Sequence, residues 1–139
     1  MADNPFVGSW TYRSLLNDPA IGTDFDQLEF GRGTIKIEEV AFDTLGGTIG
    51  GPSWSLQLHG SFGYGSPMQV RFQGKGKVGG AEWVYDYIGW LVPVWPNSTA
   101  QQQRPAIVGS VTRTVPHPSG NGKVAPAGVV ASFYAVRAD

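Results

Sequence analysis

Short runs of alternating apolar and polar residues, broken by glycines and prolines, dominate this chain. Successive side chains of a strand point to opposite faces of the sheet, so such alternation indicates one buried and one exposed face. Residues 8–14, 54–62 and 68–73 show this period most clearly, and no segment carries the 3.6-residue period of a helix. The 20 glycines and 10 prolines are spread along the chain, as expected for many short strands joined by turns.

The alternating runs predict an all-β fold of about eight strands, at residues 8–14, 28–40, 46–51, 54–62, 68–73, 82–92, 106–115 and 128–136. Residues 31–33 should break or bulge the second strand, and residues 74–80 should form a hairpin tip. Residues 17–27, 93–105 and 116–126 should be loops, the first with room for one helical turn. Strand spacing of this kind is typical of a sandwich or a barrel. We favour a single antiparallel up-and-down barrel, one domain over residues 1–139, because closure removes exposed edge strands.

Composition excludes several classes of partner. Ten basic residues stand against eleven acidic ones, for a net charge of -1, so no basic surface for nucleic acid is expected. There is no polybasic cluster or long apolar run for a membrane. The chain has no cysteine and only two histidines, so we expect no metal and no cofactor. Without a signal-peptide pattern at the N-terminus, a cytoplasmic location is expected.

The segment Phe6-Val7-Gly8-Ser9-Trp10 resembles the opening of the calycins, the group of lipocalins, fatty-acid-binding proteins and avidin/streptavidin. The stretches 34–51, 53–60 and 70–72 are similar to the streptavidin-like branch. The resemblance implies a barrel with a ligand cavity, closed at one end by Trp10, but the family's polar biotin-binding set cannot be placed residue by residue on this sequence. It also implies that a late-strand arginine packs on Trp10, a role expected of Arg113. A looser resemblance is to the allene oxide cyclase type, small barrels that shape a reactive substrate without a metal.

Aromatic residues form the main candidate site. Trp83, Tyr85 and Tyr87 share one face of the 82–92 strand, and Asp86, Ile88 and Trp90 share the other. Buried aromatics usually pack in a core, but an aromatic wall with a few hydroxyl groups also lines small-molecule pockets. The candidate ligand-binding residues are Trp10, Tyr12, Phe72, Trp83, Tyr85, Tyr87, Arg113 and Tyr134.

Arg113 shares a strand face with Ile107 and Val111, so its charge must be paired or lie at a rim. It either bridges to a carboxylate, Asp86 or Glu82, or clamps an anion or enolate inside the cavity.

Both histidines, His59 on a polar strand face and His117 in a proline-flanked loop, are expected at the surface.

Two features indicate interfaces. Trp95 lies between two prolines in the 93–105 loop, where it could cap the cavity as a lid or pack against another subunit. The 82–92 strand is apolar on both faces, which predicts a homo-oligomer, with a dimer favoured.

Three functions are compatible with these observations. The first is binding of a small, largely apolar or aromatic ligand inside the barrel. The second is a cofactor-free cyclase or isomerase, in which Arg113 and a tyrosine hydroxyl stabilise a developing oxyanion. The third is a structural or interaction domain with a filled core. The first two need a cavity of roughly 300 Å³ or more, whereas the third needs none.

Overall fold

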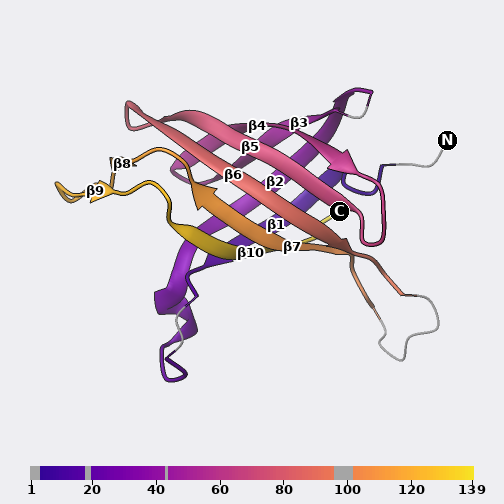
Figure 1. Ribbon diagram of the computed structural model, residues 1–139, viewed down its shortest axis with the longest axis horizontal. Coiled ribbons are helices and arrows are strands. Elements are labelled where there is room, and N and C mark those ends of the chain that lie inside the picture. Colours follow the sequence, from indigo (N-terminus) through magenta and orange to yellow (C-terminus); the bar gives the residue numbers. More distant parts are fainter. Residues whose placement is uncertain (1–3, 18–19, 43, 96–101) are drawn as a thin grey trace.

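The alternating runs form a closed barrel in the computed structural model, which describes residues 4–17, 20–42, 44–95 and 102–139 (Figure 1). Its strands are β1 (Gly8–Leu15), β2 (Glu29–Ala41), β3 (Thr44–Gly51), β4 (Trp54–Gly63), β5 (Gln69–Val78), β6 (Ala81–Val92), β7 (Ala106–Arg113) and β10 (Val130–Val136). A short 3-10 helix, η1 (Phe25–Leu28), provides the helical turn expected before β2. A separate pair, β8 (His117–Pro118) and β9 (Val124–Ala125), forms a small hairpin.

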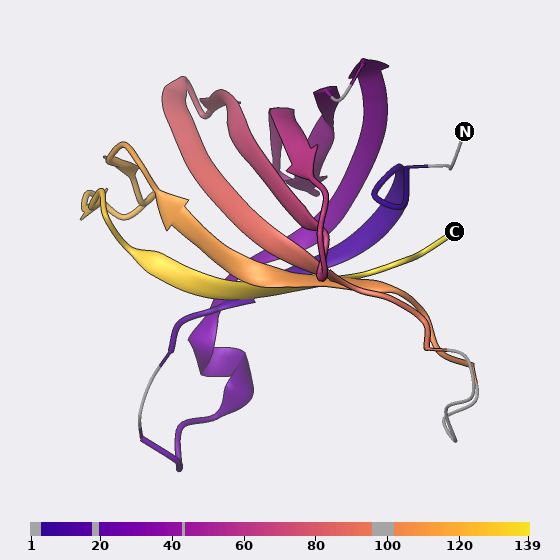
Figure 2. The same cartoon turned by 45° about the vertical axis from the view of Figure 1, so that its right-hand side comes forward.

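The strand order around the barrel is β1-β10-β7-β6-β5-β4-β3-β2, and all neighbouring strands are antiparallel. The predicted eight-stranded up-and-down barrel is therefore confirmed. The β8–β9 hairpin is inserted between β7 and β10 and projects from one end of the barrel (Figure 2). No helix in the described part of the chain is long and apolar enough to span a membrane.

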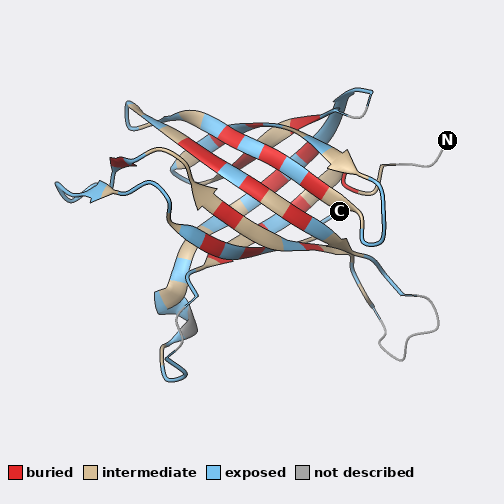
Figure 3. Cartoon of the chain, in the orientation of Figure 1, coloured by how far each residue is buried: buried red, intermediate tan, exposed pale blue. Residues whose placement is uncertain are grey.

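Burial alternates along the strands as the sequence pattern predicts (Figure 3). In β6, Tyr85 and Tyr87 are buried whereas Asp86 and Trp90 are exposed. The inward side chains form a continuous core inside the barrel, which includes Trp10, Tyr12, Ile35, Ile37, Leu45, Ile49, Leu56, Leu58, Val70, Phe72, Ile107, Val111 and Phe133. Strands of this period in a closed barrel bury one face only, so the outward face of each strand carries most of the polar residues.

Two predicted interruptions of strands, at residues 31–33 and 74–80, differ from those that the structure shows. β2 runs unbroken through residues 31–33, and the irregularity in its pairing with β1 falls one residue earlier, at Phe30. β5 continues through the predicted hairpin tip to Val78, and Gly79 and Gly80 form the turn. Gly74 stays in the strand because its missing side chain leaves room for Leu56, whose Cδ1 would lie 3.2 Å from an added Cβ. Residues 96–101 of the predicted 93–105 loop lie outside the described residues.

Trp10 closes one end of the barrel. Its side chain is fully buried, and its indole Nε1 donates a hydrogen bond of 2.9 Å to the carbonyl oxygen of Phe6. The guanidinium of Arg137 lies 4.7 Å from the centre of the Trp10 ring, a cation–π distance. The expectation that Arg113 packs on Trp10 is therefore wrong. The register of the first and last strands brings Trp10 opposite Arg137, just after β10.

Candidate functional site

The barrel end that lies opposite Trp10 contains a cavity of about 240 Å³. We call it the aromatic cavity, and its lining residues are Tyr12, Phe30, Gly31, Trp54, Trp83, Tyr85 and Tyr87. A second cavity of about 480 Å³ lies between the barrel rim and the β8–β9 hairpin. The two share Phe30, Trp83 and Tyr85 as lining residues. An opening at the rim therefore adjoins the aromatic cavity.

Strand β6 contributes three of the lining rings because Trp83, Tyr85 and Tyr87 are two residues apart and all point inward. Tyr87 packs edge-on against Tyr12, with ring centres 6.0 Å apart. Trp54, from the start of β4, lies 6.5 Å from Trp83. Aromatic pairs at these distances hold one another in place, so the cavity walls are positioned by ring packing.

Phe30 enters the cavity through a β-bulge. The pairing of β1 with β2 joins Ser14 to Gly31 and Leu15 to Glu29, which leaves Phe30 as an extra residue on β2. Strict alternation would send neighbouring residues to opposite faces, yet both Phe30 and Gly31 line the cavity. The extra residue therefore turns a ring inward that a regular strand would expose.

The phenol hydroxyl groups of Tyr12 and Tyr87 are buried in this part of the barrel. Tyr12 Oη donates a hydrogen bond of 2.8 Å to Oγ of Ser14, a residue that is fully buried. Burial raises the pKa of Tyr12 to about 12, against a smaller opposing effect of the Ser14 hydrogen bond. Burial also raises the pKa of Tyr87 well above its ordinary value. Both phenols stay protonated and uncharged at neutral pH.

The buried phenols predict a loss of stability in alkali. Between pH 10 and about 12, the unfolded chain has released the Tyr12 and Tyr87 protons but the folded protein retains them. Folding is then opposed by about 1.4 kcal/mol per pH unit for each phenol, whereas the stability is complete below pH 10. Urea unfolding at a series of pH values measures this slope. Tyr12→Phe should reduce it by about half, and a slope of zero in wild type would contradict the assignment.

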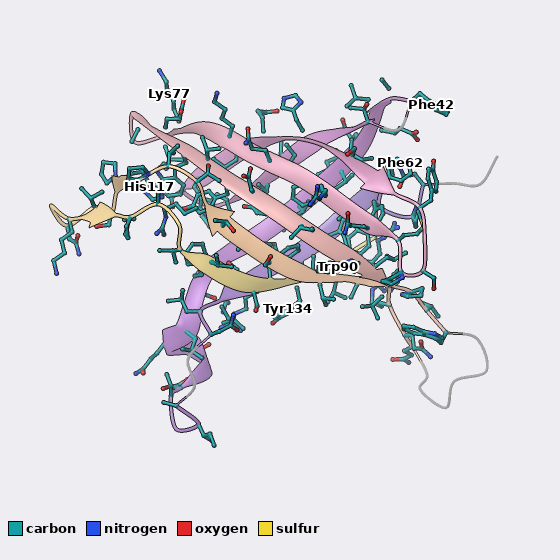
Figure 4. The ribbon with its side chains drawn as sticks, viewed as in Figure 1. Phe42, Phe62, Lys77, Trp90, His117 and Tyr134 are labelled. Carbon is teal, nitrogen blue, oxygen red and sulfur yellow. The ribbon has the colours of Figure 1, made fainter. Side chains whose placement is uncertain are left out.

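His117 is buried, not exposed at the surface as the sequence predicted. The β8–β9 hairpin brings its ring onto Trp83, with the ring centres 4.1 Å apart and the planes within 16°. Figure 4 shows His117 at the end of the barrel from which this hairpin projects, far from Phe62. His59, by contrast, is exposed on β4 as predicted.

Hydrogen bonds fix which nitrogen of a neutral His117 carries the proton. Nδ1 lies 2.9 Å from the carbonyl oxygen of Pro118, which can only accept, so Nδ1 is the donor. Nε2 then accepts from the hydroxyl of Tyr85 at 2.7 Å. Arg113 Nε donates to the same Tyr85 oxygen at 3.1 Å. Arg113, Tyr85 and His117 thus form a hydrogen-bonded chain at the rim of the aromatic cavity.

Neither of the carboxylates considered for Arg113 pairs with it. In the described part of the chain, Arg113 makes no salt bridge, and Asp86 accepts a hydrogen bond of 2.9 Å from Gln73 instead. Asp86 points out of the barrel from β6 whereas Arg113 lies at the rim. The other hydrogen bond of Arg113 goes to a neutral group, the carbonyl oxygen of Pro126, at 3.1 Å.

No family model, curated protein sequence or solved structure matches this chain. The fold nevertheless has the strand number and closure that the calycin resemblance implies, and it has an arginine packed on the first-strand tryptophan. Among the described residues, no group of three or more His, Cys, Asp or Glu side chains could hold a metal ion.

The predicted site residues fall in three places. Tyr12, Trp83, Tyr85 and Tyr87 line the aromatic cavity, Arg113 lies at its rim, and Phe72 packs on Tyr87 with ring centres 4.9 Å apart. Trp10 lies at the opposite end, and Tyr134 is on the outer surface with 37% of its area exposed (Figure 4). The expected places of Trp10 and Tyr134 in one aromatic wall are therefore wrong.

The ring-bearing residues near the two cavities that were not among the candidates include Phe30, Trp54 and His117. The sequence could have predicted Trp54, because it shares its strand face with the inward residues Leu56 and Leu58. Phe30 depends on a bulge, and His117 depends on the folding of a loop, so local alternation indicates neither.

The outer surface near Trp95 is apolar. Trp90 and Val108 are neighbours across β6 and β7, and Val108 is paired with Tyr134 of β10. Trp95 is 55% exposed, and it follows the end of β6 that is farther from Tyr85, so it cannot act as a lid over the aromatic cavity. The homodimer stays a prediction.

Proposed function

We propose that this protein binds a small, largely apolar or aromatic molecule in the aromatic cavity. One observation carries the proposal: the inward rings of β1, β2, β4 and β6 leave about 240 Å³ between them. Protein interiors are packed closely, with few voids larger than a water molecule. This space is below the roughly 300 Å³ expected of such sites, but it shares three lining residues with the adjoining cavity of about 480 Å³. Its lining of rings and a few hydroxyl groups is typical of small-molecule sites.

The architecture supports the same function. An eight-stranded barrel has an interior wide enough for one small ligand, as in lipocalins and streptavidin. The calycin resemblance of Gly8-Ser9-Trp10 implies a barrel closed at one end and open to ligand at the other. The buried plug around Trp10 and the cavity at the opposite end fit that arrangement.

A second candidate function, a cofactor-free isomerase or cyclase, is favoured by the chain of Arg113, Tyr85 and His117. His117 Nε2 is placed to take the Tyr85 proton, and the Arg113 guanidinium would face the negative oxygen that remains. The variant Tyr85→Phe separates the candidates. A binding protein would keep most of its affinity for an arene, whereas an enzyme would lose turnover.

Calorimetric titration of the purified 139-residue chain with 2-naphthalenemethanol tests the proposed binding. The variant Trp54→Ala removes one wall of the cavity and should raise the dissociation constant about tenfold, through lost ring contact. Trp95→Ala is the matched control, because it removes an exposed tryptophan outside the cavity lining. Equal losses in both variants, or no detectable binding by wild type of this alcohol or of the acid with the same rings, 2-naphthoate, would overturn the proposal.

A further inference from the structure

The rim of the aromatic cavity carries positive charge without a compensating carboxylate. Neither the aromatic cavity nor the adjoining cavity under the β8–β9 hairpin has an aspartate or glutamate among its lining residues. Arg113 is the charged group at this rim, with His117 beside it. The described acidic residues nearest in sequence to Phe30, Asp26 and Glu29, are bound to Arg13 and Arg32 instead.

Arg113 is held in position by neutral groups. Its guanidinium carbon lies 4.9 Å from the centre of the Phe30 ring and 5.8 Å from that of Tyr85. Its hydrogen bonds go to the Tyr85 hydroxyl and the Pro126 carbonyl. A half-buried guanidinium that is fixed in this way and has no counterion attracts an anion, and a planar fork of donors suits a carboxylate.

One further polar group of the site favours a hydrogen-bond acceptor on the ligand. The hydroxyl proton of Tyr85 is used by His117, so this group does not donate to a ligand. The indole Nε1 of Trp83, a residue that lines both cavities, is buried and has no hydrogen-bond partner among the described residues. A buried donor without a partner is costly unless a bound group accepts from it.

We propose that the ligand is a planar aromatic acid, with its rings among Trp54, Trp83 and Tyr87 and its carboxylate paired with Arg113. This inference rests on the proposed function. An apolar cavity of about 150 Å³ holds benzene, so about 240 Å³ suits one ring or two fused rings. Aromatic walls also attract cations, but the positive charge of Arg113 at the rim opposes a cationic ligand.

The test compares two probes of equal ring size, 2-naphthoate and 2-naphthalenemethanol, by calorimetric titration of the 139-residue chain at neutral pH. Wild type should bind the acid at least about tenfold more tightly than the alcohol, as a charge-assisted pair predicts. Arg113→Gln should remove this preference and leave the affinity for the alcohol unchanged within about threefold. Arg71→Gln, which removes an exposed arginine of β5, should leave both affinities as in wild type.

The outcomes distinguish the two proposals. Equal binding of both probes by wild type overturns the acid as ligand and leaves the aromatic binding function standing. Binding of neither probe overturns both proposals. Should Arg113→Gln fail to fold, as judged by near-ultraviolet circular dichroism, Arg113→Lys keeps the charge but loses the planar fork. Arg113→Lys should retain part of the preference for the acid. If it binds the alcohol as tightly as wild type does but no longer prefers the acid, the pairing of the carboxylate with Arg113 is contradicted.

Discussion

Replacing Trp10 with alanine should lower the free energy of unfolding by about 3–5 kcal/mol. Trp10 is fully buried at the closed end of the barrel, where its indole donates to Phe6 and its ring lies under Arg137. The variant leaves a large cavity and also removes the surface on which Arg137 packs. Since small domains are stable by only about 5–15 kcal/mol, the barrel would be close to unfolding at room temperature.

Urea unfolding followed by far-ultraviolet circular dichroism measures this loss. Trp95→Ala serves as the control, because it deletes the same side chain from an exposed position and should cost less than about 1 kcal/mol. A loss for Trp10→Ala as small as that of the control would mean that Trp10 does not close the barrel in solution.

The arginine that packs on Trp10 shows where sequence reasoning stops. The Gly8-Ser9-Trp10 motif identified the tryptophan, and the resemblance required an arginine from late in the chain. Only Arg113 was predicted for that role, although Arg137 lies as late in the chain. The choice depends on the register between β1 and the chain after β10, which are more than a hundred residues apart in sequence. Alternation sets the face of a strand but not its offset from a distant partner.

His117 was misplaced for a related reason. A histidine between prolines in a polar loop has no local feature that indicates burial. Its environment is created by the β8–β9 hairpin, which folds its ring onto Trp83 and its Nε2 onto the Tyr85 hydroxyl. The sequence therefore predicted only part of the hydrogen-bonded chain at the cavity rim, namely Arg113 and a tyrosine, and not His117.

Strand faces were the part that sequence could predict. Trp83, Tyr85 and Tyr87 were assigned to one face of their strand, and all three line the aromatic cavity. These three rings keep to one face of β6 although Val84 beside Tyr85 is also buried, so a period of two suffices for them. In β2 the bulge at Phe30 shifts the alternation by one residue, and the same rule assigns Phe30 to the wrong side. The closure of the barrel was predicted because it removes exposed edge strands, and the structure confirms it.

Replacing Gly47 with alanine should destabilise the barrel by at least about 3 kcal/mol. Gly47 lies in β3 with a φ of +133°, a backbone conformation that residues other than glycine rarely adopt. An added Cβ would also collide with the carbonyl oxygen of Lys36 and lie 2.9 Å from its carbonyl carbon. These are backbone atoms of β2, so relief requires β2 and β3 to separate.

Gly22→Ala is the matched control, because an added Cβ there meets no atom within 4 Å and the backbone needs no left-handed conformation. Its effect should stay within about 0.5 kcal/mol. Urea unfolding of both variants gives the comparison, and near-ultraviolet circular dichroism reports whether the aromatic core remains ordered. Since Ile37 is paired with Gly47 and lies in the core, separation of the two strands would loosen the packing inside the barrel as well. Equal stability of the two variants would show that β2 and β3 do not approach this closely in solution.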